Sequence, residues 1–367
     1  MKIKEEAQIV IKALQKNGFE AYLVGGSVRD FIMNIPPKDF DITTNAKPEE
    51  VQKVFEKTID TGANFGTITV LINKVQIEVT TYRIDGEYKN NRHPEGVAFT
   101  QDLIEDLKRR DFTINSIAYD GEENFIDPFG GIKDIKAKII KGVGEPEKRF
   151  REDALRLIRA IRFSCQLNFE IEEETFIALK KTAHLIENIS AERVREELKK
   201  IILSDFLHNM KLLKFLNIEL DYKKIENAPK DLETRLYLLG IKDDYMMKLK
   251  FSNREIKNVM NLHLSTIPSN EYEAKKLINK FGIENFNKLK KLHDLSFKNI
   301  ENNPIFLKDL KITGKDIEAL GIKGKEVGSL LKLCLDAVHR NPLDNEKIKL
   351  LEVINCERQF QIQKKTT

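Results

Sequence analysis

The chain has 367 residues, of which 33% are charged, and its formal net charge is +4. This length allows two or more domains, and no apolar run approaches the 18 or so residues that a membrane helix needs. The three cysteines are far apart and form no C-x-x-C pair, which excludes a disulfide framework and a zinc site. We therefore expect buried, reduced thiols in a cytoplasmic protein without a membrane partner.

Charge is shared unevenly along the chain. Residues 1–150 carry 22 Lys and Arg against 25 Asp and Glu, a net −3, and the remainder carries 40 against 33, a net +7. A basic half beside a slightly acidic half suits a polyanion-binding surface next to a metal site. Lysine-rich helices also serve solubility alone, and the excess is too small to decide between the two.

Residues 21–45 contain the first pair of chemically suggestive carboxylates. The pattern predicts a strand, a glycine turn, a short helix and a second strand that carries Asp39 and Asp41. Side chains at i and i+2 of a strand point to one face. The two carboxylates therefore predict a site for two Mg²⁺ ions, roughly 3.5–4 Å apart, of the kind used in phosphoryl transfer.

The same segment contains a predicted phosphate site. Gly25 and Gly26 expose backbone N–H groups at a helix start, where phosphate oxygens are commonly held. Arg29 would add a charge-assisted hydrogen bond to the same anion. A glycine turn or a D-x-D strand alone is equally typical of plain structure.

In combination these signals are more specific: the motif GGxVRD is followed, after eight residues, by DxD. This order resembles the nucleotidyltransferase superfamily related to DNA polymerase beta. Within it, the chain is similar to the bacterial class II tRNA CCA-adding enzymes and to the bacterial poly(A) polymerases. The resemblance implies an α+β fold, with a small polymerase-beta-like head of mixed sheet and helices followed by an all-helical neck, body and tail.

The next segments predict further strands and a loop. Gly66–Ile72 and Val75–Tyr82 have the pattern of a hairpin. Glu78 on its second strand is a candidate third metal ligand, and an exposed glutamate on a half-buried strand is an equal alternative. The long polar segment Arg83–Val97 predicts a functional or mobile loop. It resembles the flexible loop of complete CCA-adding enzymes, which is shortened in relatives that add only the two cytidines.

The segment DLKRRDFTINSIA, residues 106–118, is similar to the family's second motif. The resemblance implies that Arg110 contacts the triphosphate, while Asp111 and Asn115 bind the ribose or order the neighbouring arginines. Asp111 also suits the cap of a short helix, and both roles are compatible.

No strand pattern continues beyond Pro146, so we place a domain change near 140–150. Glu152–Phe163, EDALRLIRAIRF, predicts a helix. Asp153 and Arg156 form either an i,i+3 ion pair on a solvated face or a base-recognition pair. An acceptor beside a donor matches the Watson–Crick edges of cytosine and adenine, but not those of uracil and guanine.

The base-recognition pair (Asp153 and Arg156) matches the family's fourth motif, and the resemblance extends nucleotide binding to Arg159 and Arg162. The fifth motif, ISAERVREELKKIIL, implies residues that brace the neck: Glu192, Arg193 and Glu197. The C-terminal segment is similar to the family's tail and predicts RNA-phosphate contacts from Lys315, Lys323 and Lys325.

The resemblance implies a tRNA nucleotidyltransferase that adds C, C and A to the tRNA 3′ end from CTP and ATP, with two Mg²⁺ ions and release of pyrophosphate. Its expected domains are a catalytic head (1–145), a neck with base recognition (146–205), a body (206–305) and a tRNA-binding tail (306–367). A poly(A) polymerase, an enzyme of partial CC- or A-adding activity and a non-catalytic RNA-binding protein are the alternatives. No protein partner is evident.

Overall fold

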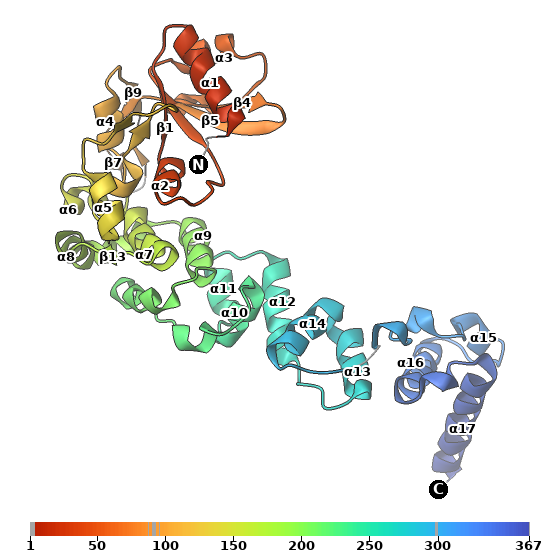
Figure 1. Ribbon diagram of the computed structural model, residues 1–367. Helices are drawn as coiled ribbons and strands as arrows, with labels where there is room; N and C mark the ends of the chain where they lie inside the picture. The colour runs from red at the N-terminus through yellow and green to blue at the C-terminus, as the bar shows by residue number, and fades with distance from the viewer. Residues whose placement is uncertain (1–3, 87, 90–92, 95, 298–299, 367) are drawn as a thin grey trace. The chain divides into compact units, whose positions relative to one another are not determined.

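The computed structural model describes residues 4–86, 88–89, 93–94, 96–297 and 300–366. The chain forms two compact units, Met1–Asn227 with Met247–Phe251 and Ala228–Met246 with Ser252–Thr367 (Figure 1). The first unit contains a mixed sheet with helices, and the described part of the second contains helices without strands. The predicted α+β class is confirmed.

A seven-stranded sheet of order β11-β10-β1-β2-β5-β4-β3 forms the centre of the first unit. Strand β2 pairs in parallel with β5 and antiparallel with β1, so the sheet is mixed. The strands are β1 (Ala21–Val24), β2 (Asp41–Thr44), β3 (Thr58–Gly62), β4 (Thr67–Ile72), β5 (Val75–Thr81), β10 (Ala118–Tyr119) and β11 (Phe125–Ile126).

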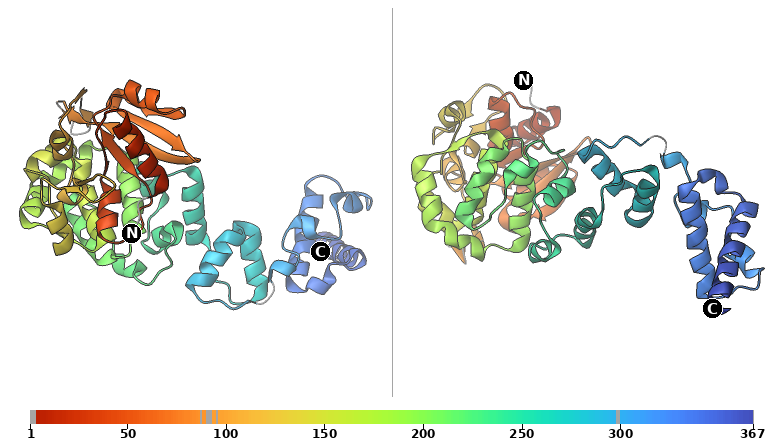
Figure 2. Two further views of the ribbon diagram at one scale, coloured as in Figure 1. Left: turned by 45° about the horizontal axis from the view of Figure 1, so that its top comes forward. Right: turned by 90° about the horizontal axis from the view of Figure 1, so that it is seen from below.

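The local sequence accounts for several of these elements. Helix α1 (Glu5–Lys16) lies beside the sheet (Figure 2) and contacts strands β1, β2 and β5. Its buried apolar residues include Val10 and Leu14. Strands β4 and β5 form the predicted hairpin. The residues between them, Asn73 and Lys74, both have positive φ, as a turn that matches the twist of a hairpin requires.

Short helices accompany this sheet and continue into a mostly helical segment. The α-helices of this part are α2 (Gly26–Ile32), α3 (Pro48–Val54), α4 (Leu103–Lys108), α5 (Gly131–Ala137), α6 (Pro146–Glu152), α7 (Leu155–Leu167), α8 (Glu173–Thr182) and α9 (Ala191–Ile202). The remaining α-helices are α10 (Leu232–Leu238), α11 (Asp243–Lys248), α12 (Asn253–Leu264), α13 (Glu271–Phe281), α14 (Ile283–Leu292), α15 (Gly314–Glu318), α16 (Lys325–Arg340) and α17 (Lys347–Thr366).

The expectation that no strand follows Pro146 is wrong. A strand does follow Pro146, because β13 (Glu170–Ile171) pairs in parallel with β12 (Ile139–Ile140). Further along, the segment Leu207–Leu216 is a 3₁₀ helix. Two-residue strands give no alternation, and the sequence pattern therefore cannot reveal them.

The predicted loop Arg83–Val97 includes residues 87, 90–92 and 95, which lie outside the described residues. At its base, β6 (Arg83–Asp85) pairs antiparallel with β9 (Val97–Phe99). A two-residue ribbon further along joins β7 (Tyr88–Lys89) to β8 (His93–Pro94). The described part of the loop is therefore built from short paired strands.

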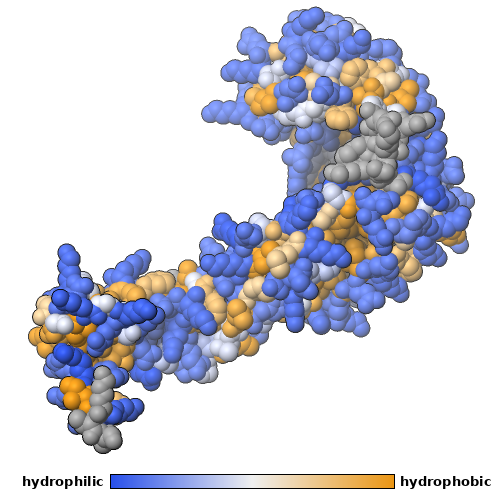
Figure 3. All heavy atoms as spheres, turned by 180° about the vertical axis from the view of Figure 1, so that it is seen from behind, coloured by the Kyte–Doolittle hydropathy of each residue, from blue (hydrophilic) through white to orange (hydrophobic). Residues whose placement is uncertain are grey.

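Hydrophilic residues dominate the face drawn in Figure 3, with apolar residues in smaller patches. Among the residues that the structure describes, no helix has both the length and the apolar character needed to cross a bilayer. Cys165 and Cys334 are buried free thiols, as predicted, but Cys356 is exposed. Cys356 lies on α17, most of whose side chains face solvent.

Candidate active site

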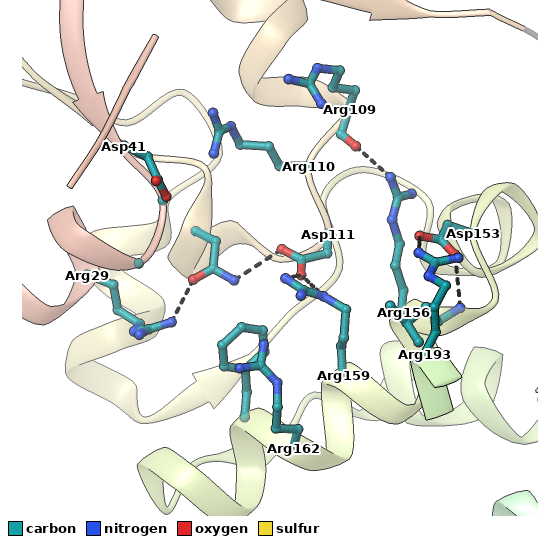
Figure 4. A pocket seen from close by; sticks show the side chains of 15 residues that line it. Arg29, Asp41, Arg109, Arg110, Asp111, Asp153, Arg156, Arg159, Arg162 and Arg193 are labelled. Carbon is teal, nitrogen blue, oxygen red and sulfur yellow. Dashed lines mark hydrogen bonds and ion pairs between the residues drawn. The ribbon is translucent and has the colours of Figure 1, made fainter. Parts of the chain in front are cut away.

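A polar cavity of about 430 Å³ lies in the first unit, beside the glycine turn (Figure 4). Arginines outnumber carboxylates in its wall, so the cavity favours an anion. Its charged lining residues are Arg29, Arg109, Arg110, Arg156, Arg159, Arg162, Arg193, Asp41, Asp111 and Asp153. Arg29 and Arg110 lie on the same side as Asp41, whereas Asp153, Arg156 and Arg193 lie on the opposite side.

The glycine turn lines the first of these sides. Gly25 has φ of 73°, and a Cβ atom there would lie 3.3 Å from Arg110 Nη1 and 3.7 Å from Asp41 Oδ2. A Cβ atom on Gly26 would lie 3.6 Å from Arg29 Nη2. Glycine at position 25 thus serves two needs, a left-handed backbone and the close approach of an arginine and a carboxylate.

The predicted carboxylates lie at the same edge of the sheet. Asp41 is the first residue of β2 and is the Cα partner of Glu78 on β5. Asp39 lies in a bend before β2, so it does not share a strand with Asp41 as predicted. The strand alternation argument therefore fails for this pair, because the chain becomes extended only at Asp41.

Electrostatic coupling links the three carboxylates. Part of the Asp41 surface is open to solvent. The pKa of its carboxyl group is nevertheless raised, and the largest cause is the water that surrounding protein atoms displace from it. Repulsion from Glu78, and more weakly from Asp39, raises the pKa of Asp41 further, while Arg110 opposes the shift. Within the described residues, no group of three His, Cys, Asp or Glu side chains is gathered closely enough to hold an ion. Glu78 itself is exposed between buried Ile77 and Val79.

A hydrogen-bonded chain crosses the floor of the cavity. Arg29 Nη1 donates to Asn115 Oδ1 at 2.9 Å, and Asn115 Nδ2 donates to Asp111 Oδ1 at 3.1 Å. Arg159 donates to Asp111 Oδ2 from Nε at 2.8 Å and from Nη2 at 2.5 Å. Both Asp111 oxygens thus orient arginines directly or through Asn115. Asp111 also accepts from the Phe112 N–H at 2.8 Å, but the following 3₁₀ turn begins after Phe112, so Asp111 is not its cap.

We expect the Asp111–Arg159 pair to stabilise the protein in a pH-dependent way. Burial alone raises the pKa of Asp111, but Arg159 and Asn115 outweigh it and hold that pKa well below its usual range. A lowered native pKa gives stabilisation that is complete above the ordinary aspartate pKa of about 3.9 and is lost as pH falls below it. Urea unfolding between about pH 7 and pH 2.5 should show this loss.

Asp111→Asn provides the comparison. The variant should be less stable at neutral pH by about 1.5–3 kcal/mol, the usual contribution of a charged hydrogen bond. Its stability should also fall less steeply below about pH 4 than that of the unmodified protein. Equal pH slopes for the two proteins would contradict the assignment.

An aromatic ring supports the arginines from below. Phe163 on α7 is buried, and the guanidinium carbons of Arg29, Arg159 and Arg162 lie 5.2, 5.4 and 3.9 Å from its ring centroid. The ring face attracts cations and so offsets part of their mutual repulsion. Burial, followed by the neighbouring Arg159, lowers the pKa of Arg162 to about 10, which leaves Arg162 charged at neutral pH. Arg162 Nε also pairs with Glu197 Oε2 at 2.6 Å.

The base-recognition pair does not form the helical ion pair considered above. Helix α6 ends before Asp153 and α7 begins at Leu155, so the predicted helix Glu152–Phe163 is wrong at its start. Asp153 instead pairs with Arg193 on α9, at 2.9 and 3.2 Å. Arg156 donates to Glu152 Oε2 at 2.9 Å.

Arg156 also has two backbone partners. Its Nη1 donates to the Arg149 carbonyl at 3.0 Å, and its Nη2 donates to the Arg109 carbonyl at 2.7 Å. A guanidinium has five N–H donors, so these three contacts leave donors that can face the cavity. Asp153 and Arg156 therefore line the same pocket without neutralising each other.

The predicted bracing residues divide into two groups. Arg193 pairs with Asp153, just before α7, and Glu197 pairs with Arg162 on α7. Glu192 points elsewhere, because its carboxylate accepts from Lys250 Nζ at 2.6 Å. Arg193 and Glu197 are four residues apart and therefore lie on the same face of α9, whereas Glu192 lies on another face.

The predicted RNA-binding lysines lie in the second unit. Lys315 belongs to α15, Lys325 begins α16, and Lys323 lies in the turn between the two helices. All three side chains are exposed.

Sequence reasoning missed two residues that organise this site. In the sequence, Phe163 is only the last residue of a predicted helix, and Asp106 only the first residue of the second motif. Asp106 lies three and four residues before Arg109 and Arg110, and its carboxylate pairs with both. The i,i+3 and i,i+4 spacing on a helix was the available signal.

Comparisons with known proteins identify the family. Residues 21–141 match the poly A polymerase head domain, and residues 168–218 match a probable RNA and SrmB-binding site of polymerase A. The CCA-adding enzyme of Lactococcus lactis subsp. cremoris (strain MG1363) is 36% identical over 383 residues and covers 94% of each chain. That of Geobacillus sp. (strain WCH70) is 38% identical over 386 residues, covering 95% of this chain and 96% of its own.

A solved structure gives the same result. The Bacillus stearothermophilus CCA-adding enzyme in complex with CTP matches with a TM-score of 0.85 and 31% sequence identity, over 98% of this chain and 100% of that one. Since these relatives exceed 30% identity over nearly their full lengths, the chain belongs to the CCA-adding enzyme family and is a nucleotidyltransferase.

Proposed function

We propose that this protein adds C, C and A in turn to the 3′ end of tRNA, using CTP and ATP and releasing pyrophosphate, without a nucleic-acid template. The observation that carries the proposal is the cavity itself, which has Asp41 and an arginine pair on one side and Asp153 with Arg156 on the other. A nucleoside triphosphate also has two different ends, the phosphates at one and the base at the other, and these match the two sides of the cavity.

The chain's own residues bind and orient the nucleotide in this proposal. Gly25 and Gly26 allow close approach of the triphosphate, and Arg29 and Arg110 donate to its oxygens. The ribose lies near Asn115, and Asp111 keeps Arg159 in position.

The carboxylates at the sheet edge suit divalent cations. Asp41 and Glu78 are Cα partners on neighbouring strands, and Asp39 adds a further negative charge. Burial and then their mutual repulsion raise the pKa of Asp41, and a hard cation relieves such repulsion through oxygen ligation. Asp39 and Asp41 would hold two Mg²⁺ ions, with Glu78 a candidate third ligand. When bound, these ions activate the RNA 3′-hydroxyl and stabilise the departing pyrophosphate.

Base choice is assigned to Asp153 and Arg156. The carboxylate accepts from the exocyclic amine of cytosine or adenine, and the guanidinium donates to the adjacent ring nitrogen. Uracil and guanine present the opposite order and would leave a charged group unpaired, which costs about 1–3 kcal/mol or more. Arg159 and Arg162 complete the same wall.

We further propose the division into head (1–145), neck (146–205), body (206–305) and tail (306–367). The exposed lysines at 315, 323 and 325 would contact tRNA phosphates in the tail. The buried free thiols of Cys165 and Cys334 support a reducing compartment, the cytoplasm.

The decisive experiment supplies tRNA that ends at its discriminator base with CTP alone, ATP alone, or both. The proposal predicts a two-nucleotide extension with CTP and a three-nucleotide extension with both. Long adenosine tails would instead indicate a poly(A) polymerase, and extension that stops at two nucleotides with both substrates would indicate a CC-adding enzyme.

We expect the loop to be needed for the final adenosine. Replacing residues 86–96 with a short Gly-Ser linker retains the β6–β9 ribbon at the base of the loop. CC addition should persist and the terminal A should be lost, because the loop reshapes the pocket between the two nucleotides. Sizing the products after incubation with CTP and ATP measures this, and equal loss of all three additions would mean that the loop is only structural.

A further inference from the structure

Asp106 on α4 is a fully buried carboxylate that receives donors from two distant parts of the chain, at Thr43 and Arg83, and from the two arginines that follow it. Its Oδ1 accepts from Arg109 Nε at 3.0 Å and Nη2 at 2.7 Å, and from the Arg83 backbone N–H at 3.3 Å. Its Oδ2 accepts from Thr43 Oγ1 at 3.2 Å and Arg110 Nη2 at 3.4 Å. Each oxygen therefore serves a different arginine.

The Oδ2 side leads to the triphosphate end of the cavity. Arg110 lies between Asp106 and the glycine turn, where its Nη1 would be 3.3 Å from a Cβ atom on Gly25. Its charge also opposes the rise in the pKa of Asp41 that burial and Glu78 cause. The orientation of Arg110 relative to Asp41 thus depends on its anchor at Asp106.

The Oδ1 side leads to the base end. The two-pronged contact fixes Arg109, whose backbone carbonyl accepts the 2.7 Å hydrogen bond from Arg156 Nη2. The Arg109 guanidinium also lies 3.9 Å from Asp85 at the base of the loop. Movement of Arg109 would therefore displace the donor that faces the base.

The charge of Asp106 is what binds these partners. Burial acts to raise its pKa, but Arg109 and Arg110 outweigh burial, and the pKa of Asp106 is lowered. The carboxylate consequently stays ionised at neutral pH. With a fully buried side chain, Asp106 reaches the nucleotide only through the arginines.

We propose that Asp106 is a positioning residue that holds Arg110 at the triphosphate and, through the Arg109 backbone, Arg156 at the base. One carboxylate then sets the spacing between the two ends of the nucleotide site. The inference rests on the proposed nucleotide addition, so the unmodified protein must first extend tRNA with CTP and ATP. Absence of extension there refutes the function, whereas the variants below test Asp106.

The first test compares Asp106→Asn with Glu105→Gln. Both remove one negative charge from α4, but Glu105 is only half-buried and, in the described structure, pairs only with Lys108, at 3.0 Å. Asp106→Asn should raise KM for both CTP and ATP by about 10-fold or more, change kcat less, and increase UMP misincorporation. Glu105→Gln should match the unmodified protein. Unchanged KM and base preference in a folded Asp106→Asn would overturn the proposal.

A double-mutant cycle separates positioning from general destabilisation. If Asp106 acts on the triphosphate through Arg110, Asp106→Asn should raise KM by a clearly smaller factor in the Arg110→Met background than in the unmodified protein, because only its effect at the base end remains. If the two substitutions acted independently, the KM increases of the single variants would multiply in the double variant. That result would refute the link to Arg110.

Two milder variants test each oxygen separately and keep the proposal testable if Asp106→Asn does not fold. Thr43→Val removes a donor to Oδ2 and should raise KM about 2- to 5-fold with base preference intact. Arg109→Lys cannot make the two-pronged contact with Oδ1 and should increase UMP misincorporation more than it raises KM. Identical kinetic changes in both variants, each proportional to its loss of melting temperature, would show that Asp106 is merely structural.

Discussion

Asp41→Ala should abolish nucleotide addition while tRNA binding stays within a few-fold of the unmodified protein, and Asp39→Ala should do the same. Both carboxylates are assigned to the cations that activate the 3′-hydroxyl, whereas RNA affinity comes mainly from basic side chains elsewhere. Single-turnover addition and a filter-binding titration with the same tRNA measure the two properties. Normal turnover in either variant would refute the two-metal assignment.

Glu78→Ala distinguishes the two interpretations of that residue. A metal ligand opposite Asp41 should be nearly as sensitive as Asp41 itself, and excess Mg²⁺ should restore part of the activity. An exposed strand glutamate should be replaceable without kinetic effect. Glu49→Ala, an exposed first-turn glutamate of α3, provides a control for the loss of one negative charge.

The second large effect is expected at the base-recognition pair. Asp153→Ala and Arg156→Ala should each weaken discrimination of C and A against U and G by roughly 10- to 100-fold, from about 1.5–3 kcal/mol per charged hydrogen bond. The triphosphate contacts of Arg29 and Arg110 remain, so preference should change more than overall rate. Competition assays with labelled UTP and GTP measure the misincorporation.

Arg193→Ala is the matched control for this pair. It breaks the Asp153–Arg193 ion pair but leaves the carboxylate that faces the cavity. If Asp153 serves only to hold α9 against the start of α7, Asp153→Ala and Arg193→Ala should lower the melting temperature equally and leave base preference unchanged. Altered preference in Asp153→Ala beyond that in Arg193→Ala supports base recognition.

Local sequence was sufficient for the elements that depend on neighbouring residues. The hairpin follows from two β-branched runs around Asn73 and Lys74. The glycine turn was also predicted at its observed position. Each depends on preferences that act within a few residues, so the chain itself is enough to reveal them.

Helix boundaries and ion pairs were less predictable for a physical reason. The residues from Glu152 to Phe163 have an unbroken helical pattern, but the chain leaves the helix at Asp153, where the carboxylate turns to Arg193. An i,i+3 partner was available in Arg156, yet a contact 40 residues away was formed instead. Tertiary packing decides between such alternatives because the local pair is worth only about 0.2–0.5 kcal/mol.

By itself the sequence determined which chemical groups the site would contain: the glycines, the arginines of two motifs and the carboxylates at 39 and 41. Only the tertiary structure decided how they are connected. Parallel pairing of β2 with β5 brings Glu78 opposite Asp41, and the packing of α4 behind the sheet buries Asp106 between Thr43 and two arginines. Glu78 and Asp41 are 37 positions apart in the sequence, and Asp106 and Thr43 are 63 positions apart. Their geometry depends on how the elements pack, which no local pattern encodes.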